Sequence, residues 1–174
     1  DEQMEITQGK LVMGYRANVD YADIDKYYAL VVGSNVLGGG SHSKLFVNVR
    51  EKESLCYYIF SSIEKYKSIM FISSGIETKD YDKAVELIKK QVESVKAGDI
   101  SDEELENSKL ALVNSMKSIT DNIGGMSDFV FSQSMAKTNS EVQDIISSIE
   151  KVTKKDIVEA IKNIELDTVY FLRN

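Results

Sequence analysis

The spacing of the apolar residues changes along the chain, and this change limits the folds that are possible. Residues 10–17 and residues 68–76 alternate with a period of two, as half-buried β-strands do. Residues 84–95 and residues 105–119 instead place apolar side chains three and four positions apart, which predicts amphipathic helices. A chain that contains both periods belongs to a mixed class of α and β structure.

Helix boundaries are marked at several points. Residues 23–37 have a helical apolar pattern, and we expect the glycines at 38–40 to end this helix because glycine tolerates positive φ. Two later helix starts carry capping residues with an apolar residue on each side that can form a hydrophobic staple. These are Ser101 with Glu104, flanked by Ile100 and Leu105, and Thr153, flanked by Val152 and Ile157.

The remaining segments complete the order of the elements. We expect a short helix at 43–53, a strand at 55–63 paired antiparallel with 68–76 across a charged turn, helices at 126–136 and 141–149 after a break at Gly124 and Gly125, and a last strand at 168–172. This order predicts an α+β fold in which a mostly antiparallel sheet is covered by helices on one face.

Nothing in the sequence divides the chain. It has no linker, low-complexity tract or short-period repeat, so we expect residues 1–174 to form a single domain. Proline is absent, which permits long helices. The chain does not begin with methionine, and we expect it to be a fragment of a longer chain.

The charge of the chain argues against one class of partner. Twenty-one Lys and Arg residues stand against 28 Asp and Glu residues, which gives a net charge of −7. A nucleic-acid-binding surface needs positive charge to neutralise phosphates, so we expect no nucleic-acid partner. No apolar run approaches the roughly 20 residues of a membrane-spanning helix, and we expect no membrane span. An acidic chain with one cysteine fits a cytoplasmic location, which we take as the expectation.

Few side chains could carry chemistry by themselves. With one cysteine, Cys56, and one histidine, His42, the chain cannot assemble a zinc site of the usual Cys and His type, so we expect no metal and no cofactor in it. His42 could act as an acid or base, but a solvated loop histidine is the commoner situation. Ser41 and Ser43 lack the G-x-S-x-G context of an activated serine. Cys56 is expected to be a buried, inert thiol.

One continuous stretch, residues 37–57, is more specific than any of these single residues. A helix ends in glycines, a Ser-x-Leu-Phe helix begins at Ser43, and the segment Arg50-Glu51-Lys52-Glu53-Ser54-Leu55-Cys56-Tyr57 leads into a strand. This order resembles the second, non-catalytic domain of the pitrilysin/insulinase family of zinc peptidases, which includes the mitochondrial processing peptidases. The flanking strands and helices fit that domain from residue 10 to the end of the chain.

The resemblance implies a division of labour between two halves of a zinc metalloendopeptidase. The zinc ligands, an H-x-x-E-H helix and a distal Glu, belong to a sister domain or subunit, so zinc is expected there. This domain would enclose the peptide substrate. Arg50 and Tyr57 correspond to the family's Arg and Tyr pair, which would stabilise the negative charge that grows on the substrate carbonyl oxygen. The parent protein is then a hydrolase, and the isolated chain is expected to be inactive.

Two alternatives remain open. Ser54 occupies the family's Gly position between the helix and the strand, and a serine is strained there if the position needs positive φ. This departure and the missing zinc ligands favour a catalytically inactive structural or partner-binding subunit, like the peptidase-derived core proteins of respiratory complexes. The other alternative is an unrelated α+β ligand-binding domain.

Overall fold

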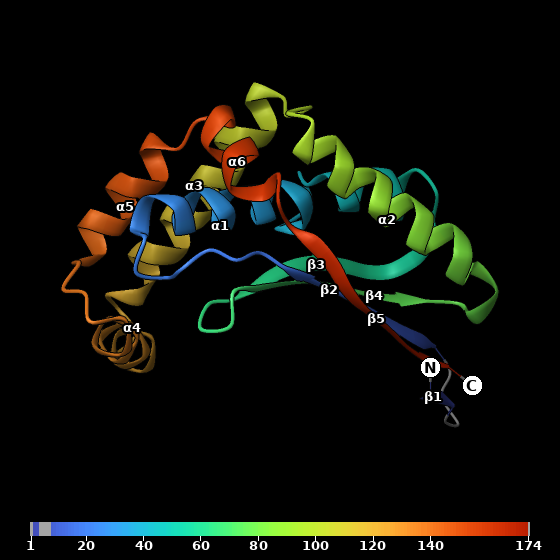
Figure 1. Cartoon of the computed structure of the whole chain (residues 1–174), viewed down its shortest axis with the longest axis horizontal. Helices are drawn as coiled ribbons and strands as arrows, with labels where there is room; N and C mark the ends of the chain where they lie inside the picture. Colours follow the sequence, from blue (N-terminus) through green and yellow to red (C-terminus); the bar gives the residue numbers. More distant parts are fainter. Residues whose placement is uncertain (1, 4–7, 174) are drawn as a thin grey trace.

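The structure is a computed structural model that describes residues 2–3 and 8–173. One sheet forms a layer, and helices cover one of its faces (Figure 1). In chain order the elements are β1 (Glu2–Gln3), β2 (Gly9–Arg16), α1 (Ile24–Gly38), the π-helix η1 (Phe46–Glu51), β3 (Cys56–Glu64), β4 (Ile69–Ile76), the 3₁₀-helix η2 (Thr78–Asp80), α2 (Tyr81–Lys96), α3 (Asp102–Ile119), α4 (Ile123–Ala136), α5 (Val142–Lys151), α6 (Lys154–Ile161) and β5 (Glu165–Arg173). The predicted α+β class and the one-sided helical cover are confirmed.

The strands lie in the order β1-β5-β2-β4-β3. β2 pairs antiparallel with both β4 and β5, and β3 pairs antiparallel with β4, as the sequence predicts. The short β1 is an unpredicted addition, which pairs parallel with the end of β5. β3 is therefore an edge strand. The turn that follows it leads directly into β4, the strand with which it pairs.

The core lies between the sheet and the helices. The alternation in the central strands sends Leu11 and Met13 of β2 and Met70 and Ile72 of β4 to the covered face, where each is at most 1% exposed. Leu30 of α1 is fully buried in the same core cluster. The alternation of apolar residues along each strand therefore indicates which face of that strand the helices cover.

Both predicted helix caps are confirmed. The Ser101 side chain accepts a hydrogen bond from the Glu104 N–H at 3.0 Å, and Glu104 Oε2 accepts one from the Ser101 N–H at 2.8 Å. Thr153 and Asp156 form the same reciprocal pair at the start of α6. Each cap satisfies N–H groups that a helix start leaves without a partner inside the helix.

The glycines at the end of α1 do not end the helix through a positive φ, in contrast to the expectation from the sequence. Gly39 caps α1 with a φ of −86°, so the helix does not end through a positive φ at this residue. Gly38 is instead required by close packing, because a Cβ there would lie 2.5 Å from the backbone nitrogen of Ser61 in β3. The glycine lets the end of α1 approach the edge strand.

Two further boundaries differ from the expectation. The short helix expected at 43–53 becomes a π-helix over Phe46–Glu51, and the Lys52 N–H bonds back to the Val47 carbonyl at 3.1 Å. Gly124 and Gly125 do not separate two helices but lie in the first turn of α4, where Asn122 caps the Gly125 N–H at 3.0 Å. Glycine is tolerated in that turn because the capping side chain supplies the hydrogen bond.

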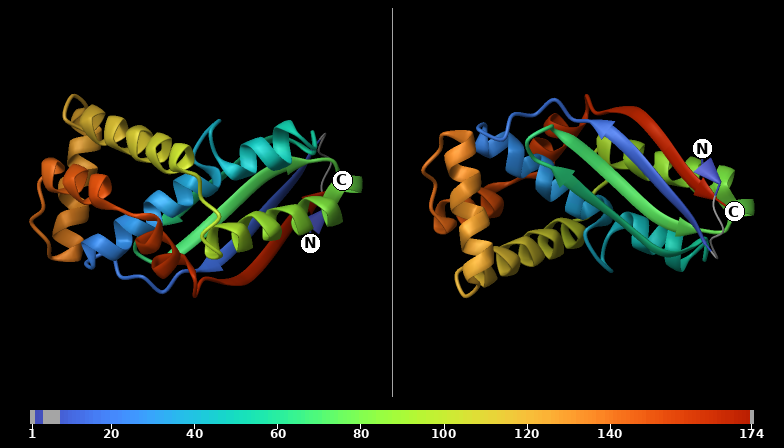
Figure 2. Two further views of the ribbon diagram at one scale, coloured as in Figure 1. Left: turned by 90° about the horizontal axis from the view of Figure 1, so that it is seen from above. Right: turned by 90° about the horizontal axis from the view of Figure 1, so that it is seen from below.

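The face of the sheet opposite the helices is open (Figure 2). Viewed from below, the strands lie in front of the helices, and α4 crosses one end of the molecule. Tyr58, Phe60 and Tyr170 are between 38% and 44% exposed, and the rings of Tyr58 and Phe60 stack with centroids 6.0 Å apart. Within the described ranges, the structure contains no helix with the length and apolar character needed to cross a membrane.

We predict that Gly38→Ala destabilises the fold by about 1–3 kcal/mol, because the added methyl group meets the backbone of β3 and cannot be relieved by a rotamer change. Urea unfolding followed by circular dichroism measures the effect. Gly125→Ala is the matched control, since its Cβ would have only ordinary contacts at 3.7 Å and alanine favours the helix. Equal stability of the two variants would contradict the close-packing account.

Candidate functional site

The segment that carries the family resemblance connects η1 to the edge strand β3. The Leu55 N–H donates to the Val49 carbonyl at 3.3 Å, which ties the start of the strand to the π-helix. Arg50 lies in η1, and Tyr57 is the second residue of β3. Both predicted site residues are thus held at the same end of β3 by a short, bonded connection.

The Arg50 guanidinium lies against an aromatic ring. Its guanidinium carbon lies 4.6 Å from the centroid of the Phe46 ring, one turn earlier in η1, which is a cation–π contact. Among the described residues no carboxylate lies within 4.0 Å of the guanidinium nitrogens, and the side chain is half-buried. The ring orients the guanidinium and leaves its N–H donors available for an external acceptor.

Tyr57 is exposed because the edge strand bulges. Cys56 pairs with Ile76 and Tyr58 pairs with Gly75, so Tyr57 is the extra residue between two ladder positions. Its side chain is 69% exposed, whereas Cys56 beside it is buried. Tyr57 is therefore not part of the core, and its hydroxyl is free to donate to an acceptor outside the chain.

Ser54 has the backbone conformation that the resemblance led us to examine. Its φ is 51°, in the left-handed region that favours glycine. A serine in this region carries backbone strain of about 1 kcal/mol or more, here at an exposed residue. The position does have positive φ, which is the condition under which we expect from the sequence that a serine is strained.

The Cys56 thiol is buried, as predicted. Burial raises its pKa, and the nearby Ser74 hydroxyl and the Arg50 charge only partly oppose that effect. A thiol with a raised pKa stays protonated and is a poor nucleophile. The buried, protonated thiol of Cys56 agrees with the expectation that this cysteine is unreactive.

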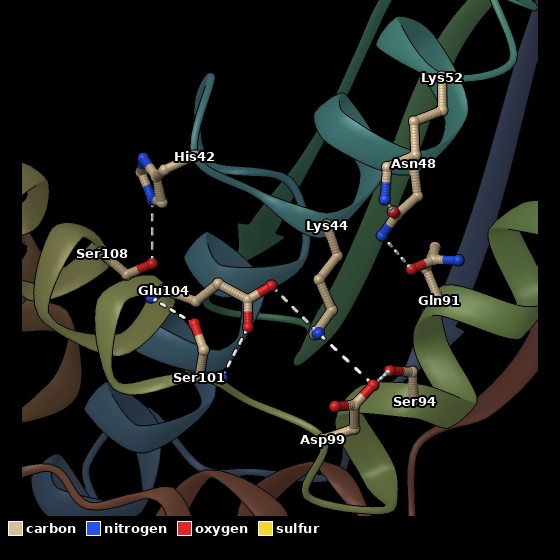
Figure 3. A network of polar contacts seen from close by, with 10 residues as sticks. All are labelled: His42, Lys44, Asn48, Lys52, Gln91, Ser94, Asp99, Ser101, Glu104 and Ser108. Atoms are coloured by element: carbon tan, nitrogen blue, oxygen red, sulfur yellow. Dashed lines mark hydrogen bonds and ion pairs between the residues drawn. The ribbon is translucent and has the colours of Figure 1, made fainter.

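His42 is held more firmly than the solvated loop histidine we expected (Figure 3). Its Nε2 atom lies 3.0 Å from the Ser108 hydroxyl oxygen and 3.2 Å from Asn35 Oδ1, so the ring bridges α3 and α1. Burial lowers the pKa of His42, against the smaller raising effect of the Glu104 charge. Ser108 and Ser43 are fully buried, so neither hydroxyl is accessible as a nucleophile.

A buried lysine that sequence reasoning missed anchors the entrance to η1 (Figure 3). The Lys44 side chain is 8% exposed, and its Nζ atom lies 3.1 Å from Glu104 Oε1 and 3.7 Å from Asp99 Oδ2. One turn later, Asn48 Nδ2 donates to Gln91 Oε1 of α2 at 2.8 Å. These contacts fix η1, and hence Arg50, against α2 and the start of α3. Nothing local marks Lys44 as buried, because its partners lie more than 50 residues away.

The described residues provide no group of three or more His, Cys, Asp or Glu side chains that could hold a metal ion. The arrangement at the start of β3 instead offers two hydrogen-bond donors, a guanidinium and a phenol. Such donors can stabilise a growing negative charge, but they supply neither a nucleophile nor an activated water.

The chain is similar in sequence to one protein family and to two proteins of Bacillus subtilis (strain 168). A family model described as the peptidase M16 inactive domain matches residues 2–112. The chain is 42% identical over 172 residues to a Bacillus subtilis (strain 168) protein named probable inactive metalloprotease YmfF, which covers 99% of this chain and 40% of that protein. It is 31% identical over 115 residues to the uncharacterized zinc protease YmxG of the same organism, covering 64% of this chain and 27% of that protein. The chain thus spans less than half the length of these curated relatives.

Solved structures agree on the fold. A conserved protein from Enterococcus faecalis V583 superposes with a TM-score of 0.92 at 34% identity, over 99% of this chain and 41% of that one. The inactive peptidase domain of a putative zinc protease from Bordetella parapertussis has a TM-score of 0.78 at 14% identity, over 94% of this chain and 91% of that chain. A domain of nearly this extent has therefore been crystallised as a separate polypeptide.

We predict that Ser54→Gly stabilises the chain by about 1 kcal/mol. Glycine removes the strain of the left-handed conformation, and this gain exceeds the free energy lost because glycine gives the unfolded chain more conformational entropy. Ser62→Gly in β3 is the matched control. It makes the same chemical change at an exposed strand position and should destabilise by about 1 kcal/mol. Thermal and urea unfolding of the three proteins measures both signs, and a destabilised Ser54→Gly protein would refute the strain assignment.

We also predict that the bridge made by His42 weakens in acid. The unfolded chain keeps the ordinary pKa of 6.5 and the folded chain has a lower one, so the unfolded state binds the proton first as the pH falls. The stability that depends on the neutral ring is present above pH 6.5 and is lost as the pH falls from there through the folded pKa. Urea unfolding of the wild type and His42→Gln across this range tests the assignment. The same slope in both proteins would show that other groups cause the acid sensitivity.

Proposed function

Because the chain belongs to the peptidase M16 inactive-domain family, we propose that it is the zinc-free half of a two-half protein and acts as a structural, partner-binding unit. The observation that carries this proposal is its 42% identity, over 172 residues, to a relative named a probable inactive metalloprotease. The described residues also contain no group of three or more His, Cys, Asp or Glu side chains placed to hold a metal ion, which supports a division in which the sister half would hold any zinc.

The open face of the sheet is the surface that we assign to the partner. Tyr58 and Phe60 of the edge strand flank the buried Ile59, and Tyr170 of β5 precedes the buried Phe171, so these three partly exposed rings lie on the face opposite the core. Burying a large apolar side chain contributes about 1.5–3 kcal/mol, so a sister half that covers these rings would gain substantial affinity. Pairing through this face leaves the helical layer exposed on the outside of the pair.

A second candidate is the substrate-enclosing half of an active metalloendopeptidase. It is favoured by the outward position of Tyr57 and the absence of an acidic partner on Arg50 among the described residues. In that case both side chains would donate hydrogen bonds to the carbonyl oxygen of a bound peptide as negative charge develops on it. Zinc held by the sister half would supply the activated water.

We predict that the complete protein containing this chain, or the chain reconstituted with its sister half and loaded with zinc, cleaves no member of a broad peptide library. Arg50→Ala and Tyr57→Phe should then leave peptide cleavage undetectable and pairing of the two halves unchanged. Phe60→Ser should weaken pairing of the two halves by about tenfold, because one aromatic side chain of the interface is lost. Calorimetric titration of one half with the other measures this effect, with Ser62→Ala on the same exposed strand as control.

Peptide cleavage by the zinc-loaded pair would instead support the second candidate. If the zinc-loaded pair cleaves peptides and both Arg50→Ala and Tyr57→Phe lower kcat by about tenfold or more, the pair is an active peptidase and these residues stabilise the transition state. If Phe60→Ser and Ser62→Ala pair equally well with the sister half, the open face is not the pairing surface.

A further inference from the structure

A pocket of about 540 Å³ lies at the end of the sheet far from Arg50 and Tyr57. It is formed by the connection from β2 to α1, the turn between β3 and β4, and the end of α4. Eight residue steps along β3 separate Tyr57 from Lys65 in this turn, roughly 26 Å at the rise of an extended strand. The pocket is therefore separate from the site discussed above.

Three lysines converge on this pocket. Lys65 and Lys67 belong to the turn, and Lys137 follows α4. Among the described residues, no carboxylate lies within 4.0 Å of any of the three ammonium groups. The one acidic residue in the lining is Asp20, and its Oδ1 atom already accepts from the Ala22 N–H at 2.9 Å. The chain as a whole has a net charge of −7, but at this pocket the three lysines outnumber two nearby carboxylates, those of Asp20 and of Glu64, whose Oε2 atom accepts from the Lys67 N–H at 2.7 Å.

Lys65 has a fixed position in this pocket. Its Nζ atom donates to the Ser132 hydroxyl and lies 5.5 Å and 5.1 Å from the ring centroids of Tyr21 and Tyr66. The Tyr66 hydroxyl donates to the same Ser132 oxygen at 3.2 Å. A positioned ammonium loses little side-chain entropy when an anion arrives, which favours binding.

Residues with positive φ surround the same pocket. Asn18, Ser68 and Lys137 have φ values of 54°, 51° and 55°, and they are three of the four non-glycine residues with positive φ in the described chain. Lys137 is the left-handed C-cap of α4 and asparagine tolerates this region, so Ser68 is the residue of the three at which the conformation costs of order 1 kcal/mol or more. The three residues belong to three separate segments, and each marks a change of chain direction at the rim of the pocket.

An exposed apolar row on α4 continues from the pocket. Val130, Phe131 and Met135 are 58–60% exposed, and Met135 also lines the pocket. Phe131 and Met135 are four residues apart, so they lie on the same side of the helix. α4 lies at the end of the molecule beyond the sheet (Figures 1 and 2), and the exposed fractions of the three side chains show that the row is accessible there.

We propose that this pocket and the row on α4 together bind a peptide segment in which two or three carboxylates follow an apolar side chain. The lysines supply the charge complementary to the carboxylates, and Phe131 and Met135 supply contact area for the apolar residue. A phosphate group is a poorer fit, because the pocket lining contains neither an arginine fork nor a glycine-rich loop of backbone N–H groups. The site goes beyond the pairing function, since it lies at the other end of β3 and needs no zinc.

Fluorescence anisotropy of a labelled peptide with the order Leu-Phe-Glu-Asp-Glu tests the proposal on the 174-residue chain. A Leu-Phe-Gln-Asn-Gln peptide is the uncharged comparison. Lys67→Gln combined with Lys137→Asn should weaken binding of the acidic peptide by about five- to tenfold, and asparagine tolerates the positive φ at position 137. Lys89→Gln combined with Lys90→Gln on α2 makes the same change in net charge at exposed positions and should have no effect. Phe131→Ser should weaken binding severalfold at any salt concentration.

Several results would overturn the proposal. Equal binding of the acidic and uncharged peptides would exclude the lysines as the recognition element, and equal losses in both lysine pairs would show only a general effect of charge. Inorganic phosphate that binds the pocket while the peptide does not would replace the peptide with a small anion. These assays do not involve cleavage or the sister half, so their failure is distinct from failure of the pairing proposal. Circular dichroism confirms that the exposed substitutions leave the chain folded.

Discussion

The structure depends on the close packing of α1 between the sheet and the C-terminal helices. A Cβ at Gly33 would lie 2.3 Å from the Ile161 side chain of α6, and one at Gly38 would lie 2.5 Å from the Ser61 nitrogen of β3. Two glycines therefore let one helix contact both layers. The end of α1 determines where the following loop begins, and that loop leads into η1. The position of Arg50 thus depends on the packing of Gly38 against β3, twelve residues earlier in the chain.

Sequence patterns predicted the features that depend on local physics. Strand alternation identified Leu11 and Met70 as core residues because one sheet face is covered, and the Ser101 cap could be predicted because both partners lie within three residues. The exposed Tyr57 and the strained Ser54 were located through a contiguous motif. Gly38 and the π-helix were misjudged because their conformations are set by contacts with distant segments. Lys44 and the lysine pocket were missed for the same reason, since each is assembled from residues far apart in sequence.

The Lys44 contact links the position of η1 to the stability of the fold. Burial of an ammonium group is costly unless a carboxylate offsets it, and Glu104 does so while it also caps α3. Loss of either partner would leave a buried charge or an open helix start. The residues that position η1 are therefore required for folding, whatever Arg50 does. Retention of the family architecture around η1 is consequently no evidence that the parent protein cleaves peptides.

Strain at both ends of β3 has a common mechanical basis. Ser54 precedes the strand and Ser68 follows its turn, and both have positive φ. Between them the ladder with β4 runs from Cys56 to Glu64 and holds both connections in place. A strained residue persists only where the surrounding structure over-determines it, and a paired strand provides that restraint. Side chains carried by these connections are therefore ordered before any ligand arrives, so a partner at either end of β3 binds a surface that needs little rearrangement.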